Sequence, residues 1–137
     1  MIITLNKDQM AIGREQDMVP FRNRVKEYAT KIGMGLVNQT KLITAASELV
    51  RNMLRYAGGG ETLIEVVNRG RENGIRLTFT DKGPGIADVK EAMKDGYSTG
   101  KSLGLGLPGS KRLVNEFDIK SAIGKGTVVT IIKWKNG

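Results

Sequence analysis

Two glycine-rich turns that bracket one short polar segment constrain this chain more than any other feature. The first, Asp81-Lys82-Gly83-Pro84-Gly85, directly follows the alternating apolar run 75–79, which predicts a strand. The second, residues 100–106, leads into a helical pattern that we expect to extend from Leu107 to Phe117. We therefore expect a carboxylate at a strand end and free backbone N–H groups at a helix start, where anions bind.

A single ligand could contact an acceptor at Asp81 and donors near Gly104 and Gly106, and a nucleotide has this shape. Pro108 supports the helix start, because proline is best tolerated in the first helical turn. An Asp-x-Gly turn after a strand is common, however, so it indicates a nucleotide site only together with other motifs.

The remaining periodicity predicts helices early in the chain and paired strands later. Asp17 is expected to cap a packing helix over 18–32, and a second helix is expected from Asn38 to Ala57, where three glycines end it. Since strands are expected to pair as hairpins, we predict an α+β two-layer sandwich with a mixed or antiparallel sheet rather than a doubly wound sheet. The expected strands cover 2–5 and 10–12, both at a sheet edge, 62–67, 75–80, 119–122 and 128–134, with a short helix over 89–93.

Length and composition limit the chemistry. With 137 residues we expect one domain spanning 1–137, in which residues 1–9 are an N-terminal extension or an edge strand. The sequence has neither cysteine nor histidine, which removes disulfides, thiolate metal sites and imidazole catalysis. Because no apolar run reaches the length of a membrane span or a signal peptide, we expect no membrane association and a cytoplasmic location.

The formal net charge of +8 raises the question of nucleic-acid binding. Lysine and arginine are spread along the chain, and no expected strand carries paired exposed aromatic residues that could stack on bases. Nucleic acid is therefore an unlikely partner, and an acidic protein or a polyphosphate ligand fits the charge as well.

Glu48 and Asn52 lie four residues apart on the second expected helix and hence on one face. Alone, such a pair more often marks a solvated face. Beside a nucleotide, Asn52 could offer a neutral oxygen to Mg²⁺, and Glu48 could accept a proton from an attacking hydroxyl group. Asp81 would accept a hydrogen bond from the exocyclic amine of adenine and disfavour the carbonyl of guanine.

Taken in order, these motifs resemble those of a known ATP-binding fold. Glu48-Leu-Val-Arg-Asn52, Asp81-Lys-Gly-Pro-Gly85, Gly104-Leu-Gly106-Leu and Gly124-Lys-Gly126-Thr127 are similar to the N-box, G1, G2 and final threonine of the GHKL (Bergerat) fold of gyrase, Hsp90, histidine kinases and MutL. The resemblance extends from about Met10 to Trp134. Within that superfamily the chain is most similar to the small anti-sigma-factor-type serine kinases that include the stressosome switch kinases, through phrases such as ASELVRN, DGYSTG and LGLPGSKRLVNEFDI.

The resemblance implies ATP and Mg²⁺ as cofactors and assigns roles to individual residues. Asn52 would bind Mg²⁺, Glu48 would be the catalytic base, and Asp81 would recognise adenine with help from Thr127. The other implied nucleotide contacts are Gly83, Gly85, Ser98, Thr99, Lys101, Gly104, Leu105, Gly106 and Leu107. The polar segment 95–102 is expected to be a mobile loop, in which Lys101 and Ser102 replace the more glycine-rich lid of the switch kinases.

The implied function is a Mg-ATP-dependent protein serine/threonine kinase that phosphorylates a STAS-domain antagonist in a bacterial partner-switching (stressosome-like) pathway. The implied further partners are STAS-domain scaffold proteins and a PPM-type phosphatase or a sigma factor. The alternative is a nucleotide-gated binding module, an anti-sigma factor or phosphatase activator with incidental kinase activity. The presence of Glu48 favours the kinase, because binding ATP requires no base. The absence of histidine excludes a self-phosphorylating histidine kinase.

Overall fold

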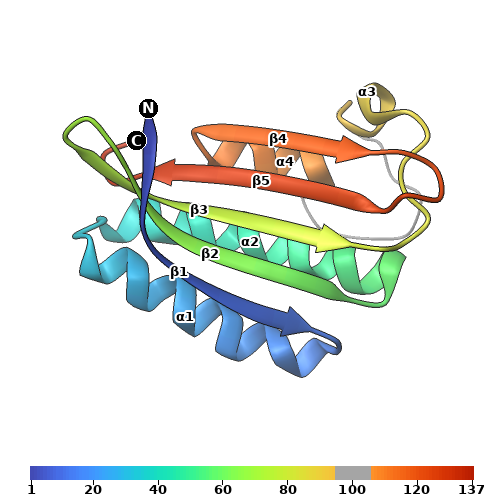
Figure 1. Ribbon diagram of the computed structural model, residues 1–137, viewed down its shortest axis with the longest axis horizontal. Helices are drawn as coiled ribbons and strands as arrows, with labels where there is room; N and C mark the ends of the chain where they lie inside the picture. Colours follow the sequence, from blue (N-terminus) through green and yellow to red (C-terminus); the bar gives the residue numbers. More distant parts are fainter. Residues whose placement is uncertain (95–105) are drawn as a thin grey trace.

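The computed structural model describes residues 1–94 and 106–137, which form one antiparallel five-stranded sheet with helices on one face (Figure 1). The strand order is β1-β2-β3-β5-β4, and this arrangement confirms the predicted α+β two-layer sandwich. No helix within the described ranges is both long and apolar enough to cross a membrane. In chain order the elements are β1 (Ile2–Ile12), the 3-10 helix η1 (Glu15–Asp17), α1 (Met18–Lys31), α2 (Leu36–Ala57), β2 (Gly60–Arg69), β3 (Glu72–Asp81), α3 (Val89–Ala92), α4 (Gly106–Leu113), β4 (Glu116–Ser121) and β5 (Thr127–Trp134).

The chain begins with one long edge strand rather than the two short strands expected from its apolar runs. β1 pairs with β2 from Ile2 to Ile12, with an irregularity between Thr4 and Asn6. Polar residues at its centre hid its continuity, since they interrupt the apolar pattern. One of them, Asp8, forms an ion pair with Arg24 of α1, which ties the edge strand to the helical layer.

The core lies between the sheet and the apolar stripes of α1 and α2. Phe21 of α1 is fully buried and meets Phe79 of β3 edge to face, with the ring centroids 5.9 Å apart. Burying one such side chain stabilises the fold by about 1.5–3 kcal/mol. The expected stripe of α2 is buried as predicted, and its members are Leu42, Ala46, Leu49, Val50 and Met53.

The start of α2 differs from expectation, whereas α1 begins at Met18 as expected but without the expected side-chain cap. α2 begins at Leu36, after Gly35, which provides no side-chain cap. It ends at Ala57 as predicted, because Gly58 adopts a left-handed conformation with φ 71°. Asp17 precedes α1, but its carboxylate accepts hydrogen bonds from the backbone N–H groups of Gly13 and Arg14, at 2.8 and 3.1 Å. It therefore closes the turn before α1 instead of capping the helix.

The predicted helix over 107–117 is too long. α4 ends at Leu113, and Phe117 lies in β4, which begins three residues before the expected strand. Asn115 causes the break: its N–H group donates to Ile132 at 2.9 Å, and its side-chain oxygen accepts from the N–H group of Trp134 at 2.8 Å. These bonds to β5 replace further helical turns, and Phe117 reaches the core from a strand.

Trp134 covers Gly74 on the face of the sheet away from the helices. Trp134 is only 4 % exposed and packs with Val67 and Ile132, whereas Ile131 points to the helical layer. A Cβ atom added to Gly74 would lie 2.6 Å from the indole ring and 2.9 Å from the carbonyl oxygen of Lys133. Only glycine fits this position.

We expect Gly74→Ala to lower the free energy of unfolding by about 1–3 kcal/mol, because the ring and a neighbouring strand must move to admit one methyl group. Urea unfolding followed by the fluorescence of Trp134, the one tryptophan of the sequence, measures this. Gly13→Ala is the matched control, since the nearest atom to an added Cβ there is a side-chain oxygen of Asp17 at 3.8 Å. Equal midpoints for the two variants would contradict the prediction.

Candidate functional site

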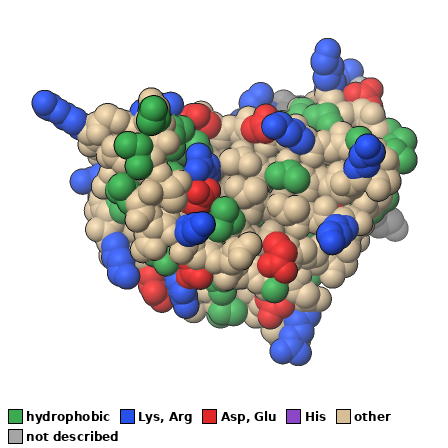
Figure 2. Space-filling model, in the orientation of Figure 1, with side chains coloured by type: hydrophobic (Ala, Val, Ile, Leu, Met, Phe, Trp, Pro, Cys, Tyr) green, Lys and Arg blue, Asp and Glu red, His purple; other side chains and the backbone are tan. Residues whose placement is uncertain are grey.

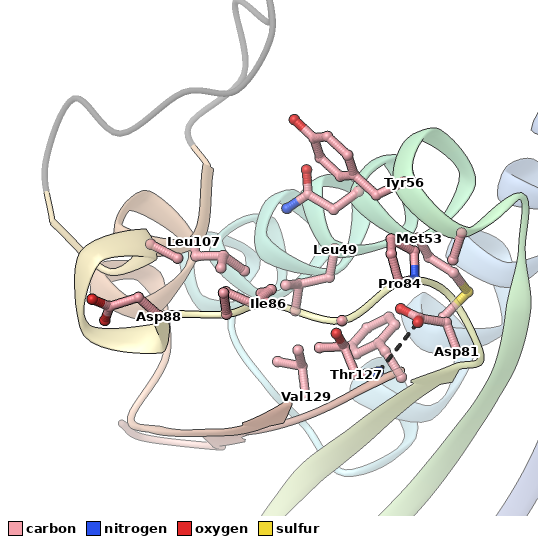
Figure 3. Close-up of a pocket in the computed structure, with 16 residues that line it drawn as sticks. Leu49, Met53, Tyr56, Asp81, Pro84, Ile86, Asp88, Leu107, Thr127 and Val129 are labelled. Atoms are coloured by element: carbon pink, nitrogen blue, oxygen red, sulfur yellow. Dashed lines mark hydrogen bonds between the residues drawn. The ribbon is translucent and has the colours of Figure 1, made fainter. Parts of the chain in front are cut away.

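A cavity of about 380 Å³ lies between α2, the segment after β3 and the start of β5 (Figure 3). Side chains of α2 form one wall, and Thr127 and Val129 of β5 lie opposite them. The cavity combines a largely apolar interior with a few polar groups, which is typical of a site for an organic ligand. It is lined by Leu49, Asn52, Met53, Tyr56, Ala57, Phe79, Asp81, Pro84, Gly85, Ile86, Ala87, Asp88, Ala92, Leu107, Thr127 and Val129.

The helical wall is one face of α2. Leu49, Asn52, Met53 and Tyr56 follow one another at helical spacing, so they share a side of the helix. Asn52 is half-buried, and its amide is the polar group in a wall that is otherwise apolar or aromatic.

Asp81, the last residue of β3, presents its carboxylate to the cavity (Figure 3). Its Oδ1 atom accepts hydrogen bonds from the backbone N–H groups of Gly83, at 2.9 Å, and Thr127, at 3.2 Å. Within residues 1–94 and 106–137, Oδ2 has no hydrogen-bond partner. The carboxylate is therefore held in one orientation by Oδ1, while Oδ2 is available to accept a hydrogen bond from a ligand.

The glycines after Asp81 are required by contacts within the protein. Gly85 has φ 77°, and a Cβ atom there would lie 2.0 Å from the carbonyl oxygen of Ala122. A Cβ atom at Gly83 would lie 2.6 Å from that of Ala57. In addition, Gly124 donates its N–H group to Pro84 at 2.8 Å. The segment after β3 is thus packed tightly between α2 and the turn that joins β4 to β5.

The hydroxyl group of Thr127 is oriented by Ser121. The Ser121 hydroxyl donates to the carbonyl oxygen of Gly126 at 2.9 Å and accepts from the N–H group of Ile86 at 2.7 Å. Thr127 Oγ1 is 2.7 Å from Ser121 Oγ. Because Ser121 has one hydroxyl proton and gives it to Gly126, Thr127 is the donor of this pair, and its lone pairs stay available beside Asp81.

Glu48 lies beside the cavity but does not line it. It is only 3 % exposed, and its Oε1 atom accepts a hydrogen bond of 3.2 Å from the N–H group of Gly106, the first residue of α4. Its Oε2 atom is 3.5 Å from Nη1 of Arg51. A carboxylate at a helix N-terminus is electrostatically favourable, so Glu48 connects α2 to the start of α4.

The structure brings together part of the site expected from the sequence. Asn52, Asp81, Gly85, Leu107 and Thr127 line the cavity, whereas Glu48, Gly83 and Gly106 lie next to it without lining it. Five expected contacts, Ser98, Thr99, Lys101, Gly104 and Leu105, and the expected loop over 95–102 lie outside the described residues.

Sequence reasoning missed Tyr56, Ile86 and Asp88, which also line the cavity. Tyr56 could have been found, because it is four residues after Asn52 and therefore on the same face of the helix. Ile86 and Asp88 carry no comparable local signal, since they belong to an irregular segment and only its path in space brings them to the cavity.

Comparison with known families identifies this fold and cavity as those of an ATPase domain. The chain belongs to the family of histidine kinase-, DNA gyrase B- and HSP90-like ATPases, whose model matches residues 37–136. Within that family it is 46% identical over 121 residues to the serine/threonine-protein kinase RsbT of Bacillus subtilis (strain 168), across 88% of this chain and 90% of that protein.

A more distant relative and one solved structure also match this chain. The chain is 27% identical over 117 residues to the anti-sigma F factor of Caldanaerobacter subterraneus, across 82% of each protein. The solved structure of the RsbU and RsbW domains of a Mycobacterium tuberculosis protein matches with a TM-score of 0.66 and 19% identity. That match covers 93% of this chain and 31% of the longer one, and at this identity it shows the shared fold alone.

Proposed function

We propose that the chain is a Mg-ATP-dependent protein serine/threonine kinase of a bacterial partner-switching pathway, and that it phosphorylates a STAS-domain antagonist in the cytoplasm. One observation carries the proposal: Asp81 and Asn52 face the same cavity, and Glu48 lies one helical turn before Asn52. The similarity to RsbT and to anti-sigma F factors supports a protein substrate and a partner-switching role.

Asp81 would recognise adenine through Oδ2, which is the carboxylate oxygen without a partner in the described chain. The exocyclic amine of adenine is a donor and fits this acceptor, whereas the carbonyl of guanine would face it unfavourably. Thr127, whose hydroxyl proton is given to Ser121, would add an acceptor at the same end of the cavity. The apolar groups around them, such as Val129 and Ile86, would contact the faces of the base.

Asn52 fits the role of a magnesium ligand, because its side chain lines the cavity and carries a neutral amide oxygen, and this ion takes most ligands from phosphates and water. When bound, Mg²⁺ would neutralise charge on the phosphates. Glu48 would then accept the proton of the attacking serine or threonine hydroxyl group.

The contact between Glu48 and Gly106 links this base to the helix expected to hold the phosphates. If a phosphate takes the N–H group of Gly106, it displaces Glu48 Oε1 and frees that atom for proton transfer. Arg51, 3.5 Å from Oε2, would hold the carboxylate in position near the reaction.

The decisive experiment is to incubate the protein with radiolabelled ATP and purified STAS-domain proteins from the same genome. Transfer of label to a serine or threonine of a STAS protein supports the kinase. ATP-dependent binding of partners without any transfer would instead establish the nucleotide-gated binding module.

We expect Asn52→Ala to abolish the magnesium dependence of ATP affinity while the free energy of unfolding changes little. The side chain is half-buried, it forms no hydrogen bond within the described residues, and alanine is the better helix former. Calorimetric ATP titrations with and without Mg²⁺ measure the first effect. Asn23→Ala, at an exposed position of α1 outside the cavity, is the control. An unchanged response to magnesium would mean that Asn52 is not a ligand.

A further inference from the structure

A second groove lies at the other end of the sheet from the cavity. In the β3–β5 ladder, Asp81 pairs with Thr127 at the cavity end and Gly74 pairs with Trp134 at the opposite end. There the β2–β3 turn and the last residues of the chain lie close together (Figure 1). They enclose a groove of about 520 Å³ lined by Arg69, Arg71, Glu72, Asn73, Lys135 and Asn136.

The carboxylates near this groove are already used within the protein. Glu72 Oε1 accepts the N–H group of Asn136 at 3.1 Å. Glu116 Oε2 accepts the indole N–H group of Trp134 at 2.9 Å and lies 3.2 Å from Nη1 of Arg69. Within residues 1–94 and 106–137, Arg71 and Lys135 form no ion pair. Three cations, Arg69, Arg71 and Lys135, face two carboxylates, Glu72 in the lining and Glu116 beside it, so the groove carries a net positive charge.

The fold holds the side chain of Arg69 and the backbone of Lys135 in place. The guanidinium group of Arg69 lies over the ring of Trp134, 4.4 Å from its centroid. The backbone of Lys135 donates to Asn73 at 2.8 Å and accepts from the side chain of Asn38 at 3.2 Å. Such preorganisation lowers the entropic cost of binding an anion.

The bond from Asn38 connects the groove to an exposed aliphatic pair. Leu36 and Val37, in the first turn of α2, are 74 % and 70 % exposed. Lys41 lies near Lys133, and burial, and then this neighbouring charge, lower the pKa of Lys133. Two exposed apolar side chains beside a cationic groove are typical of a protein-binding surface.

We propose that Arg69, Arg71 and Lys135, here called the basic groove, bind an acidic segment of a partner protein, and that Leu36 and Val37 contact an apolar side chain of that segment. Charge complementarity identifies the partner as acidic. The exposed Leu36 and Val37 favour a protein as the partner. Nucleic acid fits less well, because the groove offers no exposed aromatic ring for base stacking: Trp134 is covered. This surface is separate from the nucleotide cavity, so the proposal does not depend on kinase activity.

The test uses the full chain and a capped synthetic peptide in which one leucine is flanked on both sides by glutamates. Calorimetry at low salt is expected to show saturable binding, and the fluorescence of Trp134 is expected to change with it. Arg71→Glu combined with Lys135→Glu should weaken binding about tenfold or more, because two attractions become repulsions. Lys90→Glu combined with Lys125→Glu changes the net charge equally at other exposed sites and should have less than about a twofold effect.

Two further pairs of substitutions test the apolar contact and provide a milder change of charge. Leu36→Ser combined with Val37→Ser should weaken binding of the leucine peptide but not of the same peptide with serine in place of leucine. Arg71→Gln combined with Lys135→Gln repeats the main test with a milder change in case the double charge reversal does not fold. No peptide binding, equal weakening in the Lys90/Lys125 control, or binding of oligothymidylate through the same residues in place of the peptide would each overturn the proposal.

Discussion

Glu48→Gln is expected to slow phosphoryl transfer to a STAS-domain substrate by about 10²–10⁴-fold, the usual contribution of a general base. Glutamine keeps the shape of the side chain, and its oxygen can still accept the N–H group of Gly106 that Glu48 Oε1 accepts at 3.2 Å. The helix contact therefore survives, but the basicity needed to accept a hydroxyl proton is lost. Initial rates with labelled ATP at saturating nucleotide measure the effect.

ATP affinity and partner binding must be measured in the same preparation as the transfer rate. Both should change little, since Glu48 does not line the cavity. Some transfer is expected to remain, because phosphoryl transfer depends mainly on positioning and on stabilisation of charge. Glu15→Gln removes an exposed carboxylate of η1 that does not line the cavity, and it serves as the control. Wild-type rates in Glu48→Gln would show that Glu48 is not the base.

Asp81→Asn is expected to weaken ATP binding by about 1–3 kcal/mol, or roughly 5- to 150-fold in affinity. Oδ1 accepts two backbone N–H groups, from Gly83 and Thr127, so the asparagine oxygen should take that position. The new NH₂ group then occupies the position of Oδ2 and presents a donor to the donor amine of adenine. The affinity measured by calorimetry should fall while the loop after β3 keeps its hydrogen bonds.

Nucleotide selectivity distinguishes this effect from a general loss of charge. The wild-type protein should prefer ATP to GTP, and Asp81→Asn should reduce that preference, because the amide can donate to the guanine carbonyl. Asp118→Asn, an exposed carboxylate of β4, should leave both affinities unchanged. If Asp81→Asn binds ATP as tightly as wild type, Asp81 does not contact the base.

The main features of the fold could be predicted from the sequence because they rest on local patterns. The stripe of α2 and the glycines after Ala57 specify a helix and its end whatever lies around them. The boundary between α4 and β4 could not be predicted, because Leu113 and Phe117 have helical spacing. Hydrogen bonds from Asn115 to β5, distant in sequence, decide the outcome there.

By itself the sequence determined which chemical groups the site contains. Asn52 could be selected because the helical repeat places it on the same face as Glu48. Asp81 could be selected because it ends an alternating strand and is followed by glycines. The tertiary structure alone decided how these groups are used. It places both hydrogen bonds on Oδ1 of Asp81 and leaves Oδ2 available, and it buries Glu48 against Gly106. Such pairings join residues up to 58 positions apart, and they depend on the packing of whole elements, which no local pattern encodes.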